Sequence, residues 1–329
     1  MKTAFVTGGT GFVGINLIDE LNRQGWKVTA LHRQSSDLTY IKRFTADLVE
    51  GSITDAVSLA RAMPANVDAV FHVAGNTNFW SRRNAEQTRE NVEGTRNVVA
   101  AALEKRAKRL IVTSSISAYG IQKGEITEAT PSNAAQSWIN YQRTKWLAEE
   151  EARKGIKAGL PAVIMNPGAI VGPYDFGGWS RIFQIIAEGK LPGVPPGGIS
   201  CGHVREVVRA HIAAVERGKI GENYLLAGTG ASYAEMFGII GELVGKPVPK
   251  RLLPAPMLRI MAQAQAALAA ITGKPPQLTP EMAATLAKSN LCPSRKAQAE
   301  LGYRVVPLRT MLQDCYDWMV ADGRLKRAA

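Results

Sequence analysis

The stretch Thr7-Gly8-Gly9-Thr10-Gly11-Phe12-Val13-Gly14 decides the fold of this chain. It follows a short apolar run at residues 3–7 and opens an amphipathic segment at 12–23. Glycines between a strand and a helix allow positive φ angles and a close approach of a pyrophosphate, and the free N–H groups of the helix N-terminus attract its charge. The glycines fit two spacings, Gly9-x-Gly11-x-x-Gly14 and Gly8-x-x-Gly11-x-x-Gly14. Either spacing predicts a dinucleotide site that includes Gly8, Thr10, Gly11, Phe12, Val13 and Gly14.

Beyond this turn, short apolar runs alternate with longer amphipathic segments. Continuous apolar runs are typical of strands covered on both faces, and strand–helix alternation is typical of right-handed crossovers in a parallel sheet. We therefore predict an α/β fold, a doubly wound parallel sheet of the Rossmann type over residues 1–170, with later strands contributed from about 200–228. The predicted strands are 3–7, 27–31, 69–72, 110–113 and 162–165, and the predicted helices are 12–23, 55–62, 85–105 and 139–154.

After about residue 170 this alternation ends, and loops rich in Gly and Pro separate the helices. Such loops punctuate secondary structure strongly. We predict that residues 171–329 form mainly a smaller, mostly helical substrate-binding lobe. Its expected helices lie near 204–217, 233–244, 256–271, 279–288 and 309–321.

Composition excludes several classes of protein. With 46% hydrophobic and 21% charged residues, the 329-residue chain is neither disordered nor fibrous. Its net charge of +12 favours anionic partners, but a basic run interleaved with aromatics is missing, so nucleic acid is not expected. The three cysteines have neither metal-ligand spacing nor a disulfide framework. We expect no metal and a reducing, cytoplasmic location.

No membrane-spanning segment is expected either. The start of the chain enters the glycine turn without the apolar stretch of a signal peptide. The most apolar later segment, 252–272, is interrupted by two prolines, one arginine and two glutamines, and so lacks about 20 consecutive apolar residues. Packing against the lobe core is the preferred interpretation of this segment. Peripheral contact with a membrane, or a cover over a lipophilic substrate, is the alternative.

The end of the second strand bears on the cofactor. The run Leu31-His32-Arg33-Gln34-Ser35-Ser36 has no carboxylate to bind ribose hydroxyls, whereas Arg33 offers a fork of donors that suits a 2′-phosphate. Asp37 follows closely and is the alternative ribose ligand. The sequence therefore favours NADP(H), with NAD(H) as the alternative.

A second group of residues points to proton transfer. Tyr141 and Lys145 are four apart in a helical pattern and share one face, so the lysine cation stabilises the phenolate and lowers the phenol pKa. Ser115 ends a strand at the carboxyl edge of the sheet, where ligands bind in this architecture. A hydroxyl there is positioned to hold a substrate carbonyl. We predict that Ser115, Tyr141 and Lys145 are catalytic.

Taken together, the motifs resemble those of the extended short-chain dehydrogenase/reductase family along essentially the whole chain. The matching runs are 7–14, His72-Val73-Ala74-Gly75, Asn91-Val92-Glu93-Gly94-Thr95-Arg96-Asn97, Thr113-Ser114-Ser115 with Tyr119-Gly120, Tyr141-x-x-x-Lys145 and 166–173. By this resemblance, Tyr141 is the acid/base, Lys145 also holds the nicotinamide ribose, and Ser115 orients the reacting oxygen. The resemblance also implies cofactor contacts from Ala74, Gly75, Asn91, Thr113, Pro167, Ala169 and Ile170.

One run departs from the family pattern. Members often carry Gly-Asp before the third helix, with the Asp near the adenine, but this chain has Gly51-Ser52-Ile53-Thr54-Asp55. Ser52 and Ile53 are the residues predicted to replace that contact. The resemblance also suggests a homodimer formed through the helices around 85–105 and 138–154.

Neighbouring residues narrow the reaction. Ile116 and Ser117 stand where dehydratases of this family have Asp-Glu, which argues against elimination chemistry. The runs 163–173 and 294–303 are similar to those of the dihydroflavonol-reductase-like and 3β-hydroxysteroid-dehydrogenase-like branch. We predict an NADP(H)-dependent reductase acting on a ketone or aldehyde of a hydrophobic or aromatic small molecule; a nucleotide-sugar epimerase and a non-catalytic cofactor sensor are the alternatives. The predicted substrate contacts are Asn76, Phe79, Trp80, Phe176 and Trp179, with Trp138 as a further aromatic near the pocket.

Overall fold

The computed structural model describes residues 1–228 and 230–328. Its larger part is a seven-stranded sheet with the order β3-β2-β1-β4-β5-β6-β9, and each neighbouring pair is parallel. The order reverses at β1, so a crevice forms at the carboxyl ends of the strands on either side of this point. The predicted doubly wound sheet is confirmed. Its strands are β1 (Thr3–Thr7), β2 (Lys27–His32), β3 (Asp47–Glu50), β4 (Ala69–His72), β5 (Leu110–Thr113), β6 (Ala162–Pro167) and β9 (Asn223–Leu226).

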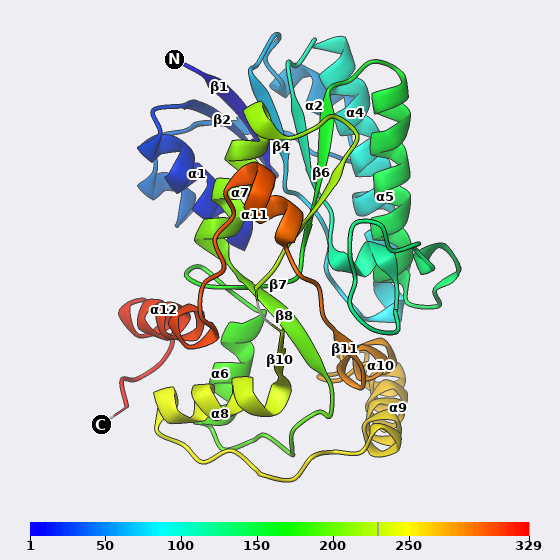
Figure 1. Cartoon of the computed structure of the whole chain (residues 1–329), viewed down its shortest axis with the longest axis vertical. Coiled ribbons are helices and arrows are strands. Elements are labelled where there is room, and N and C mark those ends of the chain that lie inside the picture. The colour runs from blue at the N-terminus through cyan, green and yellow to red at the C-terminus, as the bar shows by residue number, and fades with distance from the viewer. Residues whose placement is uncertain (229, 329) are drawn as a thin grey trace.

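Helices cover both faces of this sheet (Figure 1). Strands such as β4 and β6 are buried at every position, so helices on both sides must supply apolar faces to them. One face carries α1 (Phe12–Arg23), α7 (Val204–Arg217) and α11 (Arg295–Leu301). The other carries α2 (Ala56–Ala62), α4 (Gly94–Glu104) and α5 (Asn140–Lys157).

The predicted helix at 85–105 contains an irregular turn. The chain runs from α3 (Asn84–Thr88) through a π-helical turn at Arg89–Glu93 into α4 without leaving helical backbone angles. Such π turns are often found at functional sites because they redirect side chains along the helix. This one holds Glu90 and Asn91.

The lobe below the large sheet is built on a smaller sheet (Figure 1). In it, β8 (Gly198–His203) pairs with β7 (Ala169–Val171), β10 (Gly230–Ser232) and β11 (Ser289–Asn290). The lobe helices are α6 (Trp179–Ala187), α8 (Tyr233–Val244), α9 (Ala255–Thr272), α10 (Pro280–Leu286) and α12 (Leu308–Ala321). Short 3₁₀ turns lie at Ile41–Arg43, Ser81–Arg83, Ile116–Tyr119 and Ala134–Gln136.

The segment 200–228 divides between the two sheets. β9 joins the large sheet beside β6, as predicted for this region, whereas β8 belongs to the small sheet. α7 and α11 also return to the large sheet, where they enter the same core cluster as α1. β3 was not predicted because it is an edge strand without a fully buried residue. Among the described residues, no helix is long and apolar enough to cross a membrane.

Candidate active site

A cleft of about 730 Å³ lies at the carboxyl ends of β1, β2, β4, β5 and β6. It is lined by most of the residues predicted from the sequence. These are Gly8, Thr10, Gly11, Phe12, Val13, Gly14, Arg33, Ser52, Ile53, Ala74, Gly75, Thr113, Ser115, Tyr141, Lys145, Pro167, Ile170, Phe176 and Trp179. Asn76, Phe79, Trp80, Asn91 and Ala169 are not among the lining residues. Leu31, His32, Glu90 and Asp175 do line the cleft but were not predicted to do so.

The glycine turn is shaped for close packing against a ligand. Gly8 has a φ of +73°, and a Cβ there would lie 2.6 Å from the Ala74 nitrogen. A Cβ on Gly14 would lie 2.1 Å from the Gly8 oxygen. No side chain caps the N-terminus of α1 at Gly11, so its N–H groups face the cleft uncapped. The turn therefore fits a pyrophosphate, and Gly8 and Gly14 are its strictest positions.

Tyr141 and Lys145 lie one turn apart near the start of α5, and both are buried. Burial lowers the pKa of Lys145 to about 8, although the nearby Glu149 carboxylate opposes this shift. Burial also raises the pKa of Tyr141, and the Ser115 hydroxyl opposes that shift. Lys145 Nζ donates to the Thr113 carbonyl oxygen at 3.1 Å. The structure thus brings the three predicted catalytic residues together in one desolvated site.

Asn91 does not line the cleft, but its side chain connects two segments beside it. Its Oδ1 accepts from the Asn76 N–H at 2.7 Å, and its Nδ2 donates to the Asn76 carbonyl at 3.0 Å and to Thr144 Oγ1 at 3.1 Å. A Cβ on Gly75 would meet Lys145 Nζ at 3.2 Å and Asn91 Oδ1 at 3.5 Å. The Asn91 amide therefore holds the turn at Gly75 against α5, which fixes the space around the lysine.

His72, quoted only as part of a motif, is fully buried at the end of β4. Thr95 Oγ1 donates to the Asn91 carbonyl at 2.6 Å, which leaves it to accept from His72 Nε2 at 2.9 Å. Thr7 Oγ1 then donates to His72 Nδ1 at 2.8 Å. These partners favour a neutral ring with its proton on Nε2. Burial, together with the Lys145 charge, lowers the pKa of His72 to about 3.

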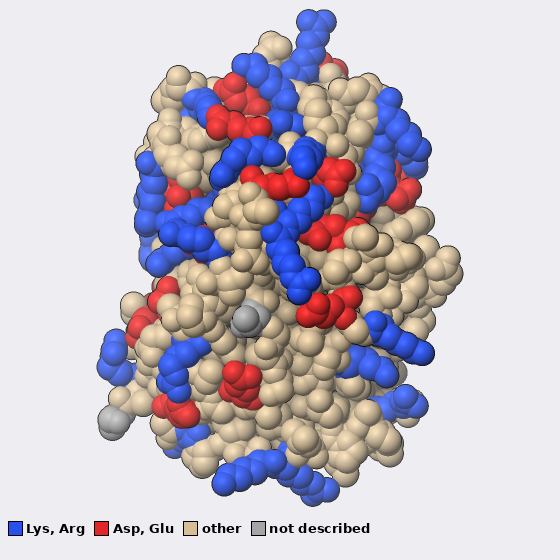
Figure 2. Space-filling view, in the orientation of Figure 1, with Lys and Arg blue, Asp and Glu red and all other residues tan. Residues whose placement is uncertain are grey.

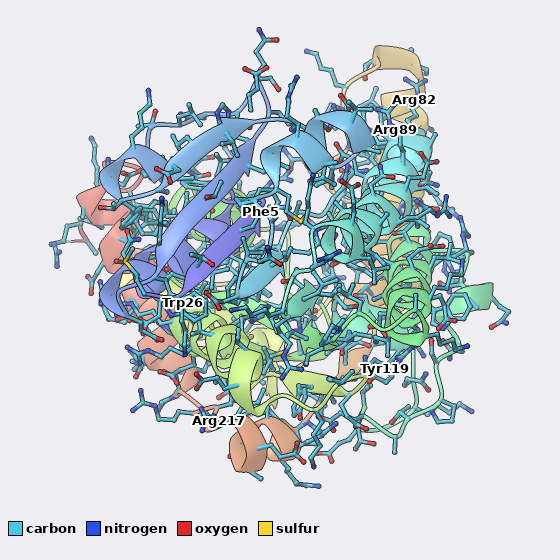
Figure 3. All side chains as sticks on the ribbon, turned by 90° about the horizontal axis from the view of Figure 1, so that it is seen from above. Phe5, Trp26, Arg82, Arg89, Tyr119 and Arg217 are labelled. Carbon is cyan, nitrogen blue, oxygen red and sulfur yellow. The ribbon has the colours of Figure 1, made fainter. Side chains whose placement is uncertain are left out.

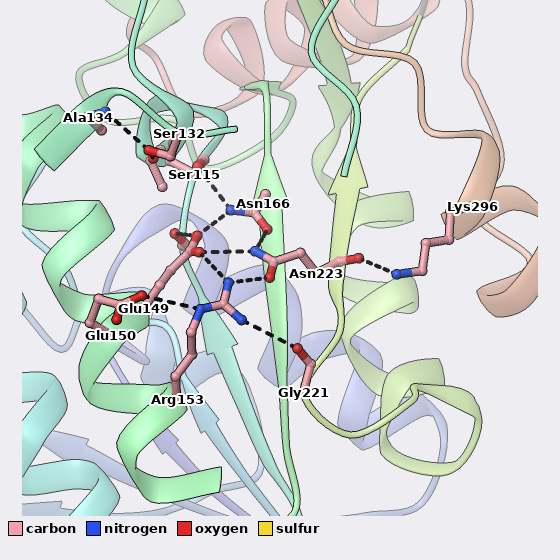
Figure 4. Close-up of polar contacts among 12 residues, drawn as sticks. Ser115, Ser132, Ala134, Glu149, Glu150, Arg153, Asn166, Gly221, Asn223 and Lys296 are labelled. Atoms are coloured by element: carbon pink, nitrogen blue, oxygen red, sulfur yellow. Dashed lines mark hydrogen bonds and ion pairs between the residues drawn. The ribbon is translucent and has the colours of Figure 1, made fainter. Parts of the chain in front are cut away.

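A buried carboxylate organises the other side of the catalytic residues (Figure 4). Glu149, one turn after Lys145, accepts from Ser114 Oγ and Asn166 Nδ2 through one oxygen, both at 2.6 Å. Its second oxygen accepts from Asn223 Nδ2 at 3.0 Å and from Arg153 Nη2 at 3.3 Å. Asn166 Nδ2 also donates to the Ser115 carbonyl at 3.1 Å. The network connects α5, β6 and β9 to the backbone of the predicted catalytic serine.

The adenosine end of the cleft contains an unpredicted acid. Arg33 Nη1 lies 3.0 Å from Glu90 Oε1, and Asn76 Nδ2 donates to the other Glu90 oxygen at 2.9 Å. Asp37, the alternative ribose ligand, instead accepts from the Thr39 N–H at 2.8 Å and does not line the cleft. Of Arg33 and Asp37, Arg33 is thus the one that lines the cleft, and its guanidinium pairs with Glu90.

The predicted aromatic residues separate into different environments. The centroid of the Phe79 ring lies 5.3 Å from that of the Tyr141 ring, beside the phenol that is predicted to be catalytic. Phe176 packs instead against Tyr40 at 4.9 Å and against Trp318 at 5.8 Å. Trp138 is 58% exposed. Of these aromatics, Phe79 is the one that touches the Tyr141 ring.

Comparison with known proteins agrees with this geometry. The sequence model of the NAD dependent epimerase/dehydratase family matches residues 4–227. The chain belongs to this family. Within it, the chain is similar to a putative dihydroflavonol 4-reductase of Synechocystis, with 30% identity over 98% of this chain and 96% of the relative. It is also similar to sterol demethylase protein B of Methylococcus capsulatus, with 30% identity over 79% of this chain and 80% of the relative.

Solved structures of the family share the architecture. The crystal structure of gox2253 has a TM-score of 0.86 and 33% identity, covering 99% of this chain and 100% of that chain. The structure of PA4631, described as a nucleoside-diphosphate-sugar epimerase from Pseudomonas aeruginosa, has a TM-score of 0.80 and 26% identity over 99% of both chains. The predicted extended short-chain dehydrogenase/reductase family is confirmed. Its reductase-named relatives support an NAD(P)-dependent oxidoreductase acting on CH–OH and C=O groups.

Proposed function

We propose that this chain is an NADP(H)-dependent reductase that interconverts a ketone or aldehyde with an alcohol on a hydrophobic or aromatic small molecule. The observation that carries the proposal is the burial of Tyr141 and Lys145 beside Ser115, in the same cleft that Arg33 lines. Ile116, the next residue after Ser115, is an apolar and buried side chain. An acid that would assist loss of water is therefore missing at this position, which favours reduction over elimination.

Different residues of the cleft would bind different parts of the dinucleotide. The uncapped start of α1 and the glycine turn fit the pyrophosphate, and Arg33 fits a 2′-phosphate. Ser52 and Ile53 line the cleft as proposed adenine contacts, while Pro167 and Ile170 border the nicotinamide end. When bound, NADPH supplies the hydride.

The side chains of the protein would carry out the proton transfer. Ser115 and Tyr141 donate hydrogen bonds to the carbonyl oxygen of the substrate, which polarises the carbon for hydride attack. Tyr141 then gives its proton to that oxygen, and the alcohol leaves. The Lys145 ammonium stabilises the phenolate until a proton returns from solvent. Because burial raises the phenol pKa, we expect the transfer to depend on this cation.

The preference for a hydrophobic substrate has two supports. The Phe79 ring packs on the Tyr141 ring from outside the cleft lining, so the phenol proposed to be catalytic has an apolar neighbour. Several relatives are named for reductases of lipophilic or aromatic compounds, including a farnesyl dihydroquinoline-oxide ketoreductase of Stigmatella aurantiaca, 31% identical, and cinnamoyl-CoA reductase 1 of rice, 28% identical.

The proposed preference for NADP(H) over NAD(H) is tested by fluorescence titration of the chain with NADPH and NADH. We expect Arg33→Ala to weaken NADPH binding about tenfold or more through loss of a charge-assisted contact, with little change for NADH. Glu90→Gln is expected to act in the opposite direction, because it frees the Arg33 guanidinium from its 3.0 Å partner. Lys42→Ala removes an exposed cation from a neighbouring turn and is the control. Equal affinities of the unmodified chain for NADPH and NADH would refute the NADP(H) preference.

The reaction itself is tested by NADPH oxidation against a panel of aromatic, aliphatic and steroidal ketones and aldehydes. Tyr141→Phe is expected to lower turnover by about 10²–10⁴-fold while retaining NADPH binding, because it removes the proton donor alone. A tightly held NAD that survives purification, with no net NADPH oxidation by any member of the panel, would favour the nucleotide-sugar epimerase instead. The homodimer through α3, α4 and α5 stays a prediction, which sedimentation of the purified chain tests.

A further inference from the structure

Helix α9 carries two apolar faces, and the lobe covers only one of them. Leu258, Ala262 and Ala269 are buried, and the first two join a small cluster with Leu253 and Ala283 of α10. The second face consists of Met257, Ile260, Ala264, Leu268 and Ile271, here called the α9 stripe. These positions recur every three or four residues and so lie on one side of the helix. All five are exposed.

The exposure of this stripe is large for apolar side chains. Ile260 is 66% exposed, Leu268 is 60% exposed and Ile271 is 85% exposed. Met257 and Leu252, at the start of the same segment, are 37% and 52% exposed. Single exposed apolar residues are ordinary, but a continuous row along a five-turn helix marks an interaction surface. The α9 stripe therefore requires a partner of its own.

Charge around the stripe indicates the kind of partner. From Leu243 to Pro280 the sequence contains no Asp or Glu. The same segment holds Lys246, Lys250, Arg251, Arg259 and Lys274, which are all exposed and form no ion pair within the part of the chain that the structure describes. Figure 2 shows neutral and basic residues, without acidic ones, on the visible surface over α9. Arg259 lies on another side of α9 from the stripe, whereas the other four cations precede and follow the helix in the chain and flank the stripe at its ends. An apolar row with unpaired cations at its ends matches an anionic lipid surface, which offers both acyl chains and phosphate charges.

A second copy of this chain fits the same face less well. Two copies meeting through the stripe would bring together the cations at the ends of each α9, and the segment offers no carboxylate to neutralise them. The like charges would oppose such a pairing at low salt. The charge pattern therefore favours a membrane over self-association.

The C-terminal end of α9 contacts the loop before α3. Arg82 Nη2 donates to the Ala270 carbonyl at 2.9 Å, so the end of α9 is joined to the loop before α3, and Figure 3 labels Arg82 in this loop. The Arg82 guanidinium lies over the Trp80 ring, 5.8 Å from its centroid. Phe79, next in this loop, packs on the Tyr141 ring. A surface that covers the stripe would thus approach the loop that borders Tyr141.

We propose that the α9 stripe and its flanking cations dock the chain onto an anionic lipid bilayer. This places the loop that borders Tyr141 next to the membrane. A lipophilic carbonyl substrate could then enter the cleft from the bilayer, a consequence that rests on the proposed reductase function. The docking itself does not rest on that function.

The test is co-sedimentation of the full chain with vesicles. We expect binding to vesicles of phosphatidylglycerol mixed with phosphatidylcholine, weaker binding at high salt, and little binding to phosphatidylcholine alone. The variant Ile260→Ser/Leu268→Ser/Ile271→Ser should lose binding about tenfold or more through loss of buried apolar area. Val57→Ser, at a 78% exposed valine of α2, is the matched control and should bind as the unmodified chain does.

Three outcomes overturn the docking proposal. They are no binding to anionic vesicles, equal binding by the triple variant, and a salt-independent dimer that the triple variant dissociates. NADPH oxidation with a water-soluble ketone, measured on the triple variant, separates this proposal from the reductase function. Unchanged turnover with lost vesicle binding is the expected pair of results. Vesicle binding by a chain that reduces no carbonyl would uphold the docking and refute the reductase.

Discussion

Replacing Glu149 with Gln is the sharpest perturbation that the structure offers. The carboxylate is buried and accepts four hydrogen bonds, two on each oxygen, from Ser114, Asn166, Asn223 and Arg153. A glutamine of the same shape has one accepting oxygen, and its NH₂ group only donates. If the NH₂ group faces Asn223 and Arg153, two donors face another donor; if it faces Ser114 and Asn166, the Ser114 hydroxyl can turn to accept from it, and Asn166 Nδ2 alone faces another donor.

The expected loss of stability follows from this count. Each hydrogen bond to a charged acceptor contributes roughly 1.5–3 kcal/mol, and the better orientation of the amide loses one of them, so the expected loss is about 1.5–3 kcal/mol. A turn of the Asn223 amide does not repair the mismatch, because its Oδ1 accepts from Arg153 at 2.7 Å and its Nδ2 donates to Asn166 Oδ1 at 2.7 Å. The free energy of unfolding in urea should therefore fall by about 1.5–3 kcal/mol.

Glu150→Gln is the matched control on the same helix. The Glu150 side chain is 41% exposed, and its ion pair with Arg153 Nε is 3.4 Å long. Removing its charge should cost less than about 1 kcal/mol, as for other exposed pairs. A Glu149→Gln variant that unfolds within about 1 kcal/mol of the unmodified chain would refute the reasoning, because four buried donors would then need no carboxylate.

The same variant has a second readout in catalysis. Glu149 raises the pKa of Lys145 and so opposes the stronger lowering by burial. Without its charge, the lysine should lose its proton at a lower pH. The alkaline limb of the turnover profile of Glu149→Gln should move to lower pH than that of Glu150→Gln. A purely structural role for Glu149 would leave this limb in place.

The remaining predictions concern other parts of the cleft. In the unmodified chain, turnover should fall as pH rises through about 8, where Lys145 loses its proton, and a profile flat to pH 10 would contradict the assigned role of the ammonium. The pKa of His72 is about 3 in the folded chain, against an ordinary value of 6.5. Its contribution to stability is therefore complete above pH 6.5 and is lost by about 1.4 kcal/mol per pH unit as the pH falls toward 3. The free energies of unfolding in urea of the unmodified chain and of His72→Asn should thus converge between pH 7 and 5. Gly14→Ala should abolish NADPH binding or folding, because the added Cβ would lie 2.1 Å from the Gly8 oxygen. A Cβ on Gly238 would meet no atom within 4 Å, so Gly238→Ala should leave the melting temperature unchanged or raise it, as measured by circular dichroism.

Several features of the fold and site follow from short-range sequence patterns. The glycine turn, the strand before it and the helix after it are adjacent in the chain, so local backbone requirements are enough to predict them. Tyr141 and Lys145 share a helix face because of helical periodicity alone. The segment 85–105 was predicted as one regular helix, but the π turn at Arg89–Glu93 gives no periodic signal and was missed.

Contacts between distant segments could not be predicted in this way. Glu90 pairs with Arg33 across 57 residues, and Asn223 reaches Glu149 across 74. Nothing in the local pattern distinguishes Glu149 from Glu150, yet one is buried in a network and the other is on the surface. Which acid is buried depends on how α5 packs against β6 and β9.

The sequence by itself determined the family, the doubly wound sheet and the trio of Ser115, Tyr141 and Lys145, because each depends on ordered motifs and on the fixed periods of helix and strand. Only the tertiary structure decided that Glu90 pairs with Arg33, that Glu149 is linked through Asn166 to the backbone of the predicted catalytic serine, and that one apolar face of α9 stays open. The physical reason is that burial and pairing depend on which surfaces meet when the chain packs. A pattern of residues along the chain defines these surfaces but does not say which of them will be covered.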